Sequence, residues 1–203
     1  MGYDEKIFKA KANIKARRLW LVFAILLTAN YGTDTANGAY SVSNYIIFVI
    51  LCWLPFVCGD ILLKRNGKDN DHYRLAFVIG YGIFYVFLLC TTTSPIAFTY
   101  ILPIISLIVI FKDEKFMIYC AVANMLSLIA SIAFHIFVLG QNTAIDHKNF
   151  QLQIACLLLC YIGYIMSVRH LTESDAALTE SIKSDLNRVV TTVEQVKTAS
   201  NTI

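Results

Sequence analysis

Hydrogen-bonding side chains recur in the 203-residue sequence where long apolar stretches end. Hydroxyl, amide, imidazole and carboxylate groups cost free energy when they leave water, so within an apolar layer they pair with one another or face a cavity. We expect one subset of these residues to line a ligand-binding cavity: Asn30, Tyr31, Asp34, Tyr45, Thr92, Tyr100 and His135. The alternative is an ordinary belt of interfacial tyrosines, together with threonines that cap helix ends.

His135, in the stretch "IAFHIFVL", offers the most versatile chemistry of this set. Histidine is the side chain that changes its charge most readily near neutral pH, so His135 would allow the protein to respond to external pH. A hydrogen bond between two helices is the more usual role of such a residue, and it is the interpretation that we favour.

No sequence pattern indicates catalysis. The chain has no GxSxG, no HExxH, no P-loop and no glycine-rich dinucleotide turn. Its six cysteines all lie in apolar stretches, with no CxxC pair, which favours packing over metal binding. We therefore expect no enzyme activity, no catalytic residue, no metal site and no cofactor.

Six apolar runs would position the polar residues. Residues of the hydrophobic types make up 57% of the chain and charged residues only 15%, which is typical of an integral membrane protein. Runs of this length satisfy their own backbone hydrogen bonds as helices. The fold class that we expect is all-α, a six-helix membrane bundle with spans near residues 19–33, 40–63, 75–93, 95–111, 116–139 and 150–168. The first run also resembles the apolar part of a cleaved signal peptide.

Basic residues indicate the orientation of the spans, because lysine and arginine accumulate in cytoplasmic loops. With six spans, Lys148 is the only one of the 17 basic residues that falls on the opposite side. We therefore expect a multi-pass protein of the cell membrane with both termini in the cytoplasm. The formal net charge of +3 fits anionic lipid headgroups as neighbours and requires no nucleic acid. The expected domains are a basic segment (1–18), a six-span sensor domain (19–170) and the start of a coiled coil (171–203).

The polar segment after the last apolar run has a helical repeat of apolar residues. From Ile182 onward these residues follow one another in alternating steps of four and three, with Ser200 filling one place. Such a pattern places them at the a and d positions of a heptad repeat, which predicts a narrow seam for a partner helix. We expect a homodimer through this seam: Ile182, Leu186, Val189, Val193, Val196 and Ile203.

The segment "ALTESIKSDLNRVVTTVEQVKTASNTI", residues 177–203, resembles the opening of the cytoplasmic helical hairpin of bacterial methyl-accepting chemotaxis proteins. A basic start with "RRLW", six spans and a fourth span ending in "FKDEK" are similar to clostridial-type receptors with a multi-span sensor. The resemblance implies a receptor truncated before its signalling hairpin. The coupling protein and the histidine kinase would be partners only of a longer chain that supplies the hairpin, and no methylation site is assigned to Glu180 or Glu194.

The function that we expect is the membrane input module of a chemotaxis-type transmembrane receptor. A signal would pass through the sixth span into a dimeric cytoplasmic helix. A small transporter or channel is one alternative, for which Asn124, Ser127 and Ser131 would line one face of the fifth span. The others are a sensor module of a histidine kinase or cyclic-dinucleotide enzyme, and an assembly protein that uses the tail to hold partners.

Overall fold

The fold is entirely helical across the residues that the computed structural model describes, 5–92 and 94–201. The seam residue Ile203 lies outside this part of the chain. The helices, with η for the 3-10 type, are α1 (Glu5–Ala36), α2 (Val42–Asn66), α3 (His72–Thr91), η1 (Ala97–Ile101), α4 (Leu102–Ile108), η2 (Val109–Phe111), α5 (Glu114–Phe137) and α6 (Ala144–Asn201).

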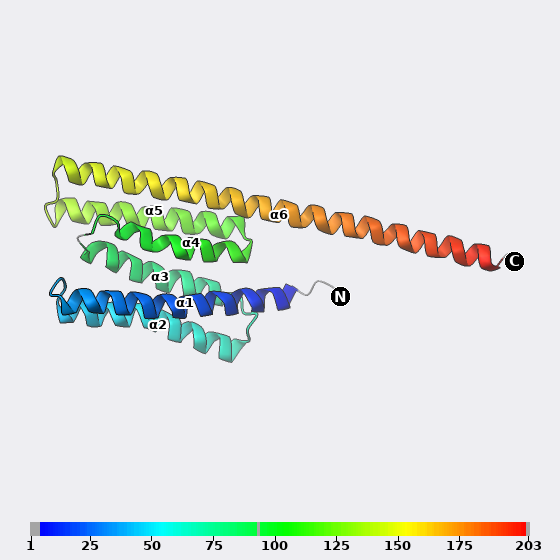
Figure 1. Cartoon of the computed structure of the whole chain (residues 1–203), viewed down its shortest axis with the longest axis horizontal. Helices are drawn as coiled ribbons and strands as arrows, with labels where there is room; N and C mark the ends of the chain where they lie inside the picture. The colour runs from blue at the N-terminus through cyan, green and yellow to red at the C-terminus, as the bar shows by residue number, and fades with distance from the viewer. Residues whose placement is uncertain (1–4, 93, 202–203) are drawn as a thin grey trace.

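The helices lie side by side and alternate in direction, so that the connections fall at two ends of one bundle (Figure 1). We call the end at which α1 begins the tail end, because α6 passes it and continues well beyond the other helices (Figure 1). The opposite end, where α1, α3 and α5 finish, is called the far end. Helix α6 therefore runs from the far end, along the whole bundle, and out past the tail end.

Four helices of the described chain are long and apolar enough to cross a membrane, namely α2, α3, α5 and α6. The segment Ala97–Phe111, which comprises η1, α4 and η2, is a shorter apolar helix. Helix α1 runs beside these elements and has 32 residues, but it is not among the helices that are apolar enough to cross a membrane. The chain is thus an all-helical, multi-pass membrane protein.

Helix α1 begins well before the apolar run that predicted it. It includes most of the expected basic segment, residues 1–18, and shows no break at residue 18. The reason is a stripe of buried residues at intervals of four, Ala12, Ala16, Trp20 and Ala24, which continues from the basic part into the apolar part. Residues four apart share one helix face, so the same face packs against the bundle along this whole length.

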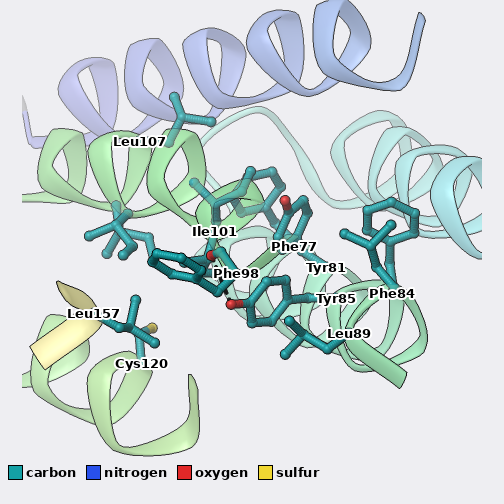
Figure 2. Close-up of a cluster of buried hydrophobic side chains, with 14 of the residues drawn as sticks. Phe77, Tyr81, Phe84, Tyr85, Leu89, Phe98, Ile101, Leu107, Cys120 and Leu157 are labelled. Carbon is teal, nitrogen blue, oxygen red and sulfur yellow. Dashed lines mark hydrogen bonds between the residues drawn. The ribbon is translucent and has the colours of Figure 1, made fainter. Parts of the chain in front are cut away.

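Helix α3 occupies the centre of the bundle and supplies much of its core (Figure 2). It packs against α2, α5 and η1. Its buried residues are Tyr73, Phe77, Tyr81, Phe84, Tyr85, Leu88 and Leu89. Burial of large aromatic side chains is the main source of stability in such a core.

The fourth apolar run is less regular than the single span expected for residues 95–111, because Pro103 lacks an N–H group. A 3-10 turn would pair the carbonyl of Tyr100 with the N–H of residue 103, which proline does not have. The hydroxyl of Tyr81 donates to this carbonyl instead. Tyr85 Oη donates to the carbonyl of Phe98 at 2.9 Å (Figure 2). Pro103 sits in the first turn of α4, where proline is tolerated, although the helical segment Ala97–Phe111 continues on both sides of it.

Helices α2 and α3 approach each other closely at Pro55 and Gly80. A Cβ atom added to Gly80 would lie 2.3 Å from Cβ of Pro55, far inside van der Waals contact. The missing side chain at residue 80 is therefore what allows the proline of α2 to pack against α3.

Candidate ligand-binding site

A polar pocket of about 100 Å³ lies at the far end, between the ends of α3 and α5 and the start of α6. Such a volume holds a few water molecules or a solute of similar size. Its polar lining residues are Thr92, Ser94, Ser131, His135, Gln141, Asp146, Asn149 and Gln153. Their concentration in one cavity of a largely apolar protein makes this far-end pocket the candidate ligand-binding site.

His135 forms the buried side of the far-end pocket, with only 7% of its surface exposed. Its Nε2 lies 2.7 Å from the carbonyl oxygen of Leu89 on α3, and its Nδ1 lies 3.0 Å from Oε1 of Gln141. The contact with Leu89 joins α5 to α3, as the sequence analysis favoured for this residue. A carbonyl oxygen can only accept, so Nε2 carries the proton and donates it to Leu89.

Thr92, at the end of α3, connects the pocket to a stack of aromatic rings. Its Oγ1 lies 3.0 Å from Oη of Tyr40 and accepts a hydrogen bond from the backbone N–H of Ser94. The ring of Tyr40 stacks on Tyr31 at 4.3 Å between centroids, and Tyr31 stacks on Phe48 at 4.1 Å. Tyr31 therefore lies near the pocket as a packing residue and does not line it.

Four other predicted ligand-binding residues lie apart from the far-end pocket. Tyr45 lines a shallow groove between α1 and α2 that also includes Trp53. Asn30 is exposed, and Asp34 is half-buried near the end of α1. Tyr100 lies in η1, where its carbonyl accepts the hydrogen bond from Tyr81. The structure thus places Thr92 and His135 in one cavity. It does not bring all seven of the predicted residues together there.

The first turns of α6 supply a wall of the pocket that sequence reasoning missed. Asp146, Asn149 and Gln153 line it, and Nε2 of Gln153 donates to the carbonyl of Pro95 at 2.9 Å. These residues are three and four positions apart, so they share one helix face. Polar residues at that spacing, directly before an apolar run, were the available signal.

Charged residues dominate the tail end. Asp60 of α2 pairs with Arg17 of α1 at 2.6 Å and with Lys64, four residues later on α2, at 2.8 Å. Arg74 Nη1 of α3 lies 2.7 Å from Oδ2 of Asp113. Where opposite charges on different helices pair in this way, they fix the relative positions of the helices.

Two further ion pairs at the tail end hold α6 where it leaves the bundle. Arg169 of α6 donates from Nε to Oε1 of Glu114, the first residue of α5, at 3.0 Å. Lys112, directly after η2, pairs with Asp175, a little further along α6. All of these pairs except Asp60–Lys64 join residues far apart in the sequence, so spacing alone could not predict them.

The tail of α6 leaves its apolar seam uncovered. The five seam residues that the structure describes are between 58% and 64% exposed: Ile182, Leu186, Val189, Val193 and Val196. Every residue from 169 to 201 is classed as exposed. Within residues 5–92 and 94–201, the bundle therefore offers this seam no partner.

Metal ligands do not gather anywhere in the described chain. Within residues 5–92 and 94–201, no three His, Cys, Asp or Glu side chains lie close enough together to hold a metal ion. The six cysteines are free thiols. The chemistry available at the far-end pocket is therefore hydrogen bonding, with Asp146 as its one carboxylate.

Comparisons of the chain with protein-family models, with curated proteins and with solved structures find no match. The likeness of residues 177–203 to a chemotaxis-receptor hairpin is therefore a prediction from the sequence alone. What the fold and composition support is a helical protein embedded in a membrane.

Proposed function

We propose that this protein is the membrane input module of a signalling receptor. In this proposal all six apolar elements cross the membrane, both termini lie in the cytoplasm, and α6 transmits a stimulus to a dimeric helix. The observation that carries it is the continuity of α6, which lines the far-end pocket at Asp146, Asn149 and Gln153 and exposes an apolar seam beyond the bundle.

An unbroken helix suits the transmission of a small displacement. Helix α6 contains 58 residues and no proline, and at 1.5 Å per residue it is about 87 Å long. A shift or rotation of its first turns would be transmitted to the tail, because no break in the helix lies between them. Signalling requires an element that has two positions, and a stimulus that shifts the equilibrium between them.

The contacts of α6 with the bundle are suited to rearrangement. Only Leu157, Tyr161 and Val168 are buried along its whole length. Polar contacts supply much of the rest: Nδ2 of Asn124 donates to Oη of Tyr161, and the hydroxyls of Ser106 and Tyr164 lie 2.7 Å apart. Apolar faces that separate in a membrane can contact lipid chains instead, whereas each of these polar groups would have to find a new hydrogen-bond partner when α6 moves.

The orientation and the receptor class come from the sequence. The basic residues of the segments at the tail end favour the cytoplasm for that side. The chemotaxis-type assignment is the finer part of the proposal and rests on residues 177–203, whose heptads resemble those of methyl-accepting chemotaxis proteins. Coupling protein and histidine kinase would then be reached through a signalling hairpin attached to this tail.

Cysteine crosslinking in membranes tests the dimeric tail. In a background with the six native cysteines replaced, Val189→Cys and Val196→Cys place thiols at d positions, and Thr191→Cys and Thr198→Cys place them at f positions on the opposite face. Oxidation should yield disulfide-linked dimers at residues 189 and 196, and far fewer at residues 191 and 198. Equal yields at both pairs of positions would contradict the proposal, because a helix without a seam collides on all faces alike.

A further inference from the structure

A second and larger pocket lies at the tail end, between the first turns of α1, the turn from α2 to α3, the end of η2 and the emerging α6. Its volume is about 300 Å³, which is the lower end of the range for small-ligand sites. Neither the stimulus nor the dimer of the proposed function uses this tail-end pocket.

The depth of the tail-end pocket matches the headgroup layer of a membrane. Thr172 and Asp175 of α6 line it, and they follow Val168, the last buried residue of α6, by four and seven positions. At 1.5 Å per residue, this places them about 6–10 Å beyond Val168 along the helix axis. The headgroup region on each side of the hydrocarbon core is about 5–8 Å thick. Polar parts of lipids are therefore the molecules most concentrated at the pocket.

The lining of the pocket contains charges of both signs. Lys9, Arg74 and Lys112 supply cations, and Asp71 and Asp175 supply carboxylates. Each cation is already in an ion pair: Lys9 with Asp71 at 3.1 Å, Arg74 with Asp113, and Lys112 with Asp175. A ligand with a single negative charge would meet the carboxylates, and one with a single positive charge would meet the ammonium groups. A zwitterion satisfies both sets, since charged groups form their strongest hydrogen bonds with partners of opposite charge.

Lys112 reaches the pocket through an unusual backbone conformation. It is the only residue other than glycine with a positive φ in the described chain, at φ 51° and ψ 36°. This left-handed conformation is uncommon for a residue with a side chain. It places Lys112 Nζ 5.4 Å from the ring centroid of Phe8 and beside Asp175, so that the ammonium group bridges α1 and α6.

Asn70 provides a donor that no protein group uses. Its Oδ1 accepts a hydrogen bond from the backbone N–H of His72 at 2.8 Å, which fixes the orientation of the amide. Its Nδ2 is buried and has no hydrogen-bond partner in the described chain. An unpaired buried donor costs stability. Asn70 also lines the pocket, so a small movement of its side chain would bring Nδ2 to a phosphoryl oxygen of a bound ligand.

We propose that the tail-end pocket binds a headgroup that carries both a phosphate and a primary ammonium group, as in phosphatidylethanolamine. The phosphate binds among Lys9, Arg74 and Lys112, and the ammonium group donates to Asp71 and Asp175. Because Lys112 and Asp175 also join η2 to α6, the headgroup competes with this ion pair and changes how firmly α6 is held. That last effect rests on the proposed function, whereas the binding itself does not.

Native mass spectrometry of the purified full chain in detergent, titrated with single lipids, tests the binding. Phosphatidylethanolamine should bind as one retained molecule, about tenfold more tightly than phosphatidylcholine, whose quaternary ammonium has no N–H donor, or phosphatidylglycerol, which has no cation. Lys112→Gln and Asp175→Asn should each abolish this preference. Asp185→Asn, on the exposed tail, is the matched control and should retain it.

The outcomes of this experiment distinguish the proposed lipid from other ligands and the binding site from the receptor function. Equal binding of the three lipids, tightest binding of phosphatidylglycerol, or a preference that survives both pocket substitutions would overturn the proposal. If millimolar phosphoethanolamine displaces the lipid, the pocket recognises the phosphate and the ammonium group, and a soluble solute can supply them as well as a lipid. If it does not displace the lipid, the lipid is the ligand. Selective binding without crosslinking of the tail would retain this site and reject the receptor function.

Discussion

Helices α3 and α6 are both apolar enough to cross a membrane, yet the bundle holds them in different ways. Helix α3 buries seven of its 20 residues, five of them aromatic. Helix α6 buries three of its 58 residues, all of them before Arg169. One helix is surrounded by the packing of large side chains, and the other presents one narrow apolar face to the bundle, to which polar and ionic contacts are added.

This difference indicates where motion is least costly. Displacing α3 would separate aromatic contacts such as Trp20 with Tyr81, at 5.1 Å between ring centroids, and Phe48 with Phe84, at 5.0 Å. Displacing α6 would separate fewer buried side chains, namely Leu157, Tyr161 and Val168, together with a few hydrogen bonds and ion pairs. Regions with few buried apolar contacts open at a lower free energy than the core. A stationary α3 and a movable α6 are the arrangement that the proposed receptor needs.

The largest difference between the two helices is expected when an alanine replaces a glycine in each. Gly80→Ala in α3 drives its Cβ into Pro55, whose ring cannot move aside, so we expect a loss of about 3 kcal/mol in the free energy of unfolding. Gly163→Ala in α6 meets no atom within 4 Å, and the better helix propensity of alanine should leave stability unchanged or raise it by up to about 1 kcal/mol.

Reversible unfolding in mixed detergent micelles, followed by circular dichroism, measures both glycine variants. Equal losses for Gly80→Ala and Gly163→Ala would mean that α6 is packed as closely as α3, and the contrast between the two helices would fail.

Removal of one tyrosine hydroxyl from each helix sharpens the contrast. Tyr81→Phe leaves the carbonyl of Tyr100 without its hydrogen bond, in a place where Pro103 supplies no N–H, so we expect a loss of about 2 kcal/mol. Tyr164→Phe in α6 should cost about 0.5–1 kcal/mol. The reason is that Ser106 keeps its hydrogen bond to the carbonyl of Leu102 at 3.0 Å.

The same unfolding assay compares the two phenylalanine variants. If Tyr164→Phe were the more damaging, the hydroxyl contacts of α6 would be structural and not exchangeable.

The two helices also differ in how far the sequence predicted them. Long apolar runs gave the existence and order of the helices, because hydropathy over about 20 residues is a strong signal. The run from residue 95 to 111 was expected as one span, but its interior alternates between 3-10 and α geometry, which depends on tyrosine hydroxyls from α3. A contact between two helices leaves no periodic signal in either of them.

The candidate site was less predictable than the helices. Thr92 and His135 were found because polar residues in apolar runs are conspicuous. Asn30, Asp34 and Tyr45 were predicted to line the same cavity, but they lie apart from it. The α6 wall of the far-end pocket had a spacing signal that was available and missed. The partners of Lys112 and Glu114 lie 63 and 55 positions away, and only the folded bundle reveals such pairs.

The smallest expected effect is the one that tests the attachment of α6 most directly. Glu114→Gln removes the charge that Arg169 pairs with at the edge of the bundle, where both side chains are partly exposed. Exposed ion pairs contribute little to global stability, so we expect no resolved change in unfolding. We expect instead faster backbone hydrogen exchange in α6 around Arg169, because this contact is one of the few that hold the helix there.

Measurements at high salt and on a matched variant distinguish the loss of the Glu114–Arg169 ion pair from a general increase in the mobility of α6. The difference between Glu114→Gln and the unaltered protein should disappear in about 1 M salt, where the screening length falls to about 3 Å and the native pair is weakened as well. Asp185→Asn, which alters the 3.9 Å contact to Arg188 within the exposed tail, should leave exchange around Arg169 unchanged at any salt concentration. If Glu114→Gln also left exchange around Arg169 unchanged at low salt, the Glu114–Arg169 pair would have no part in holding α6, and its attachment would rest on its buried residues and on its other polar contacts.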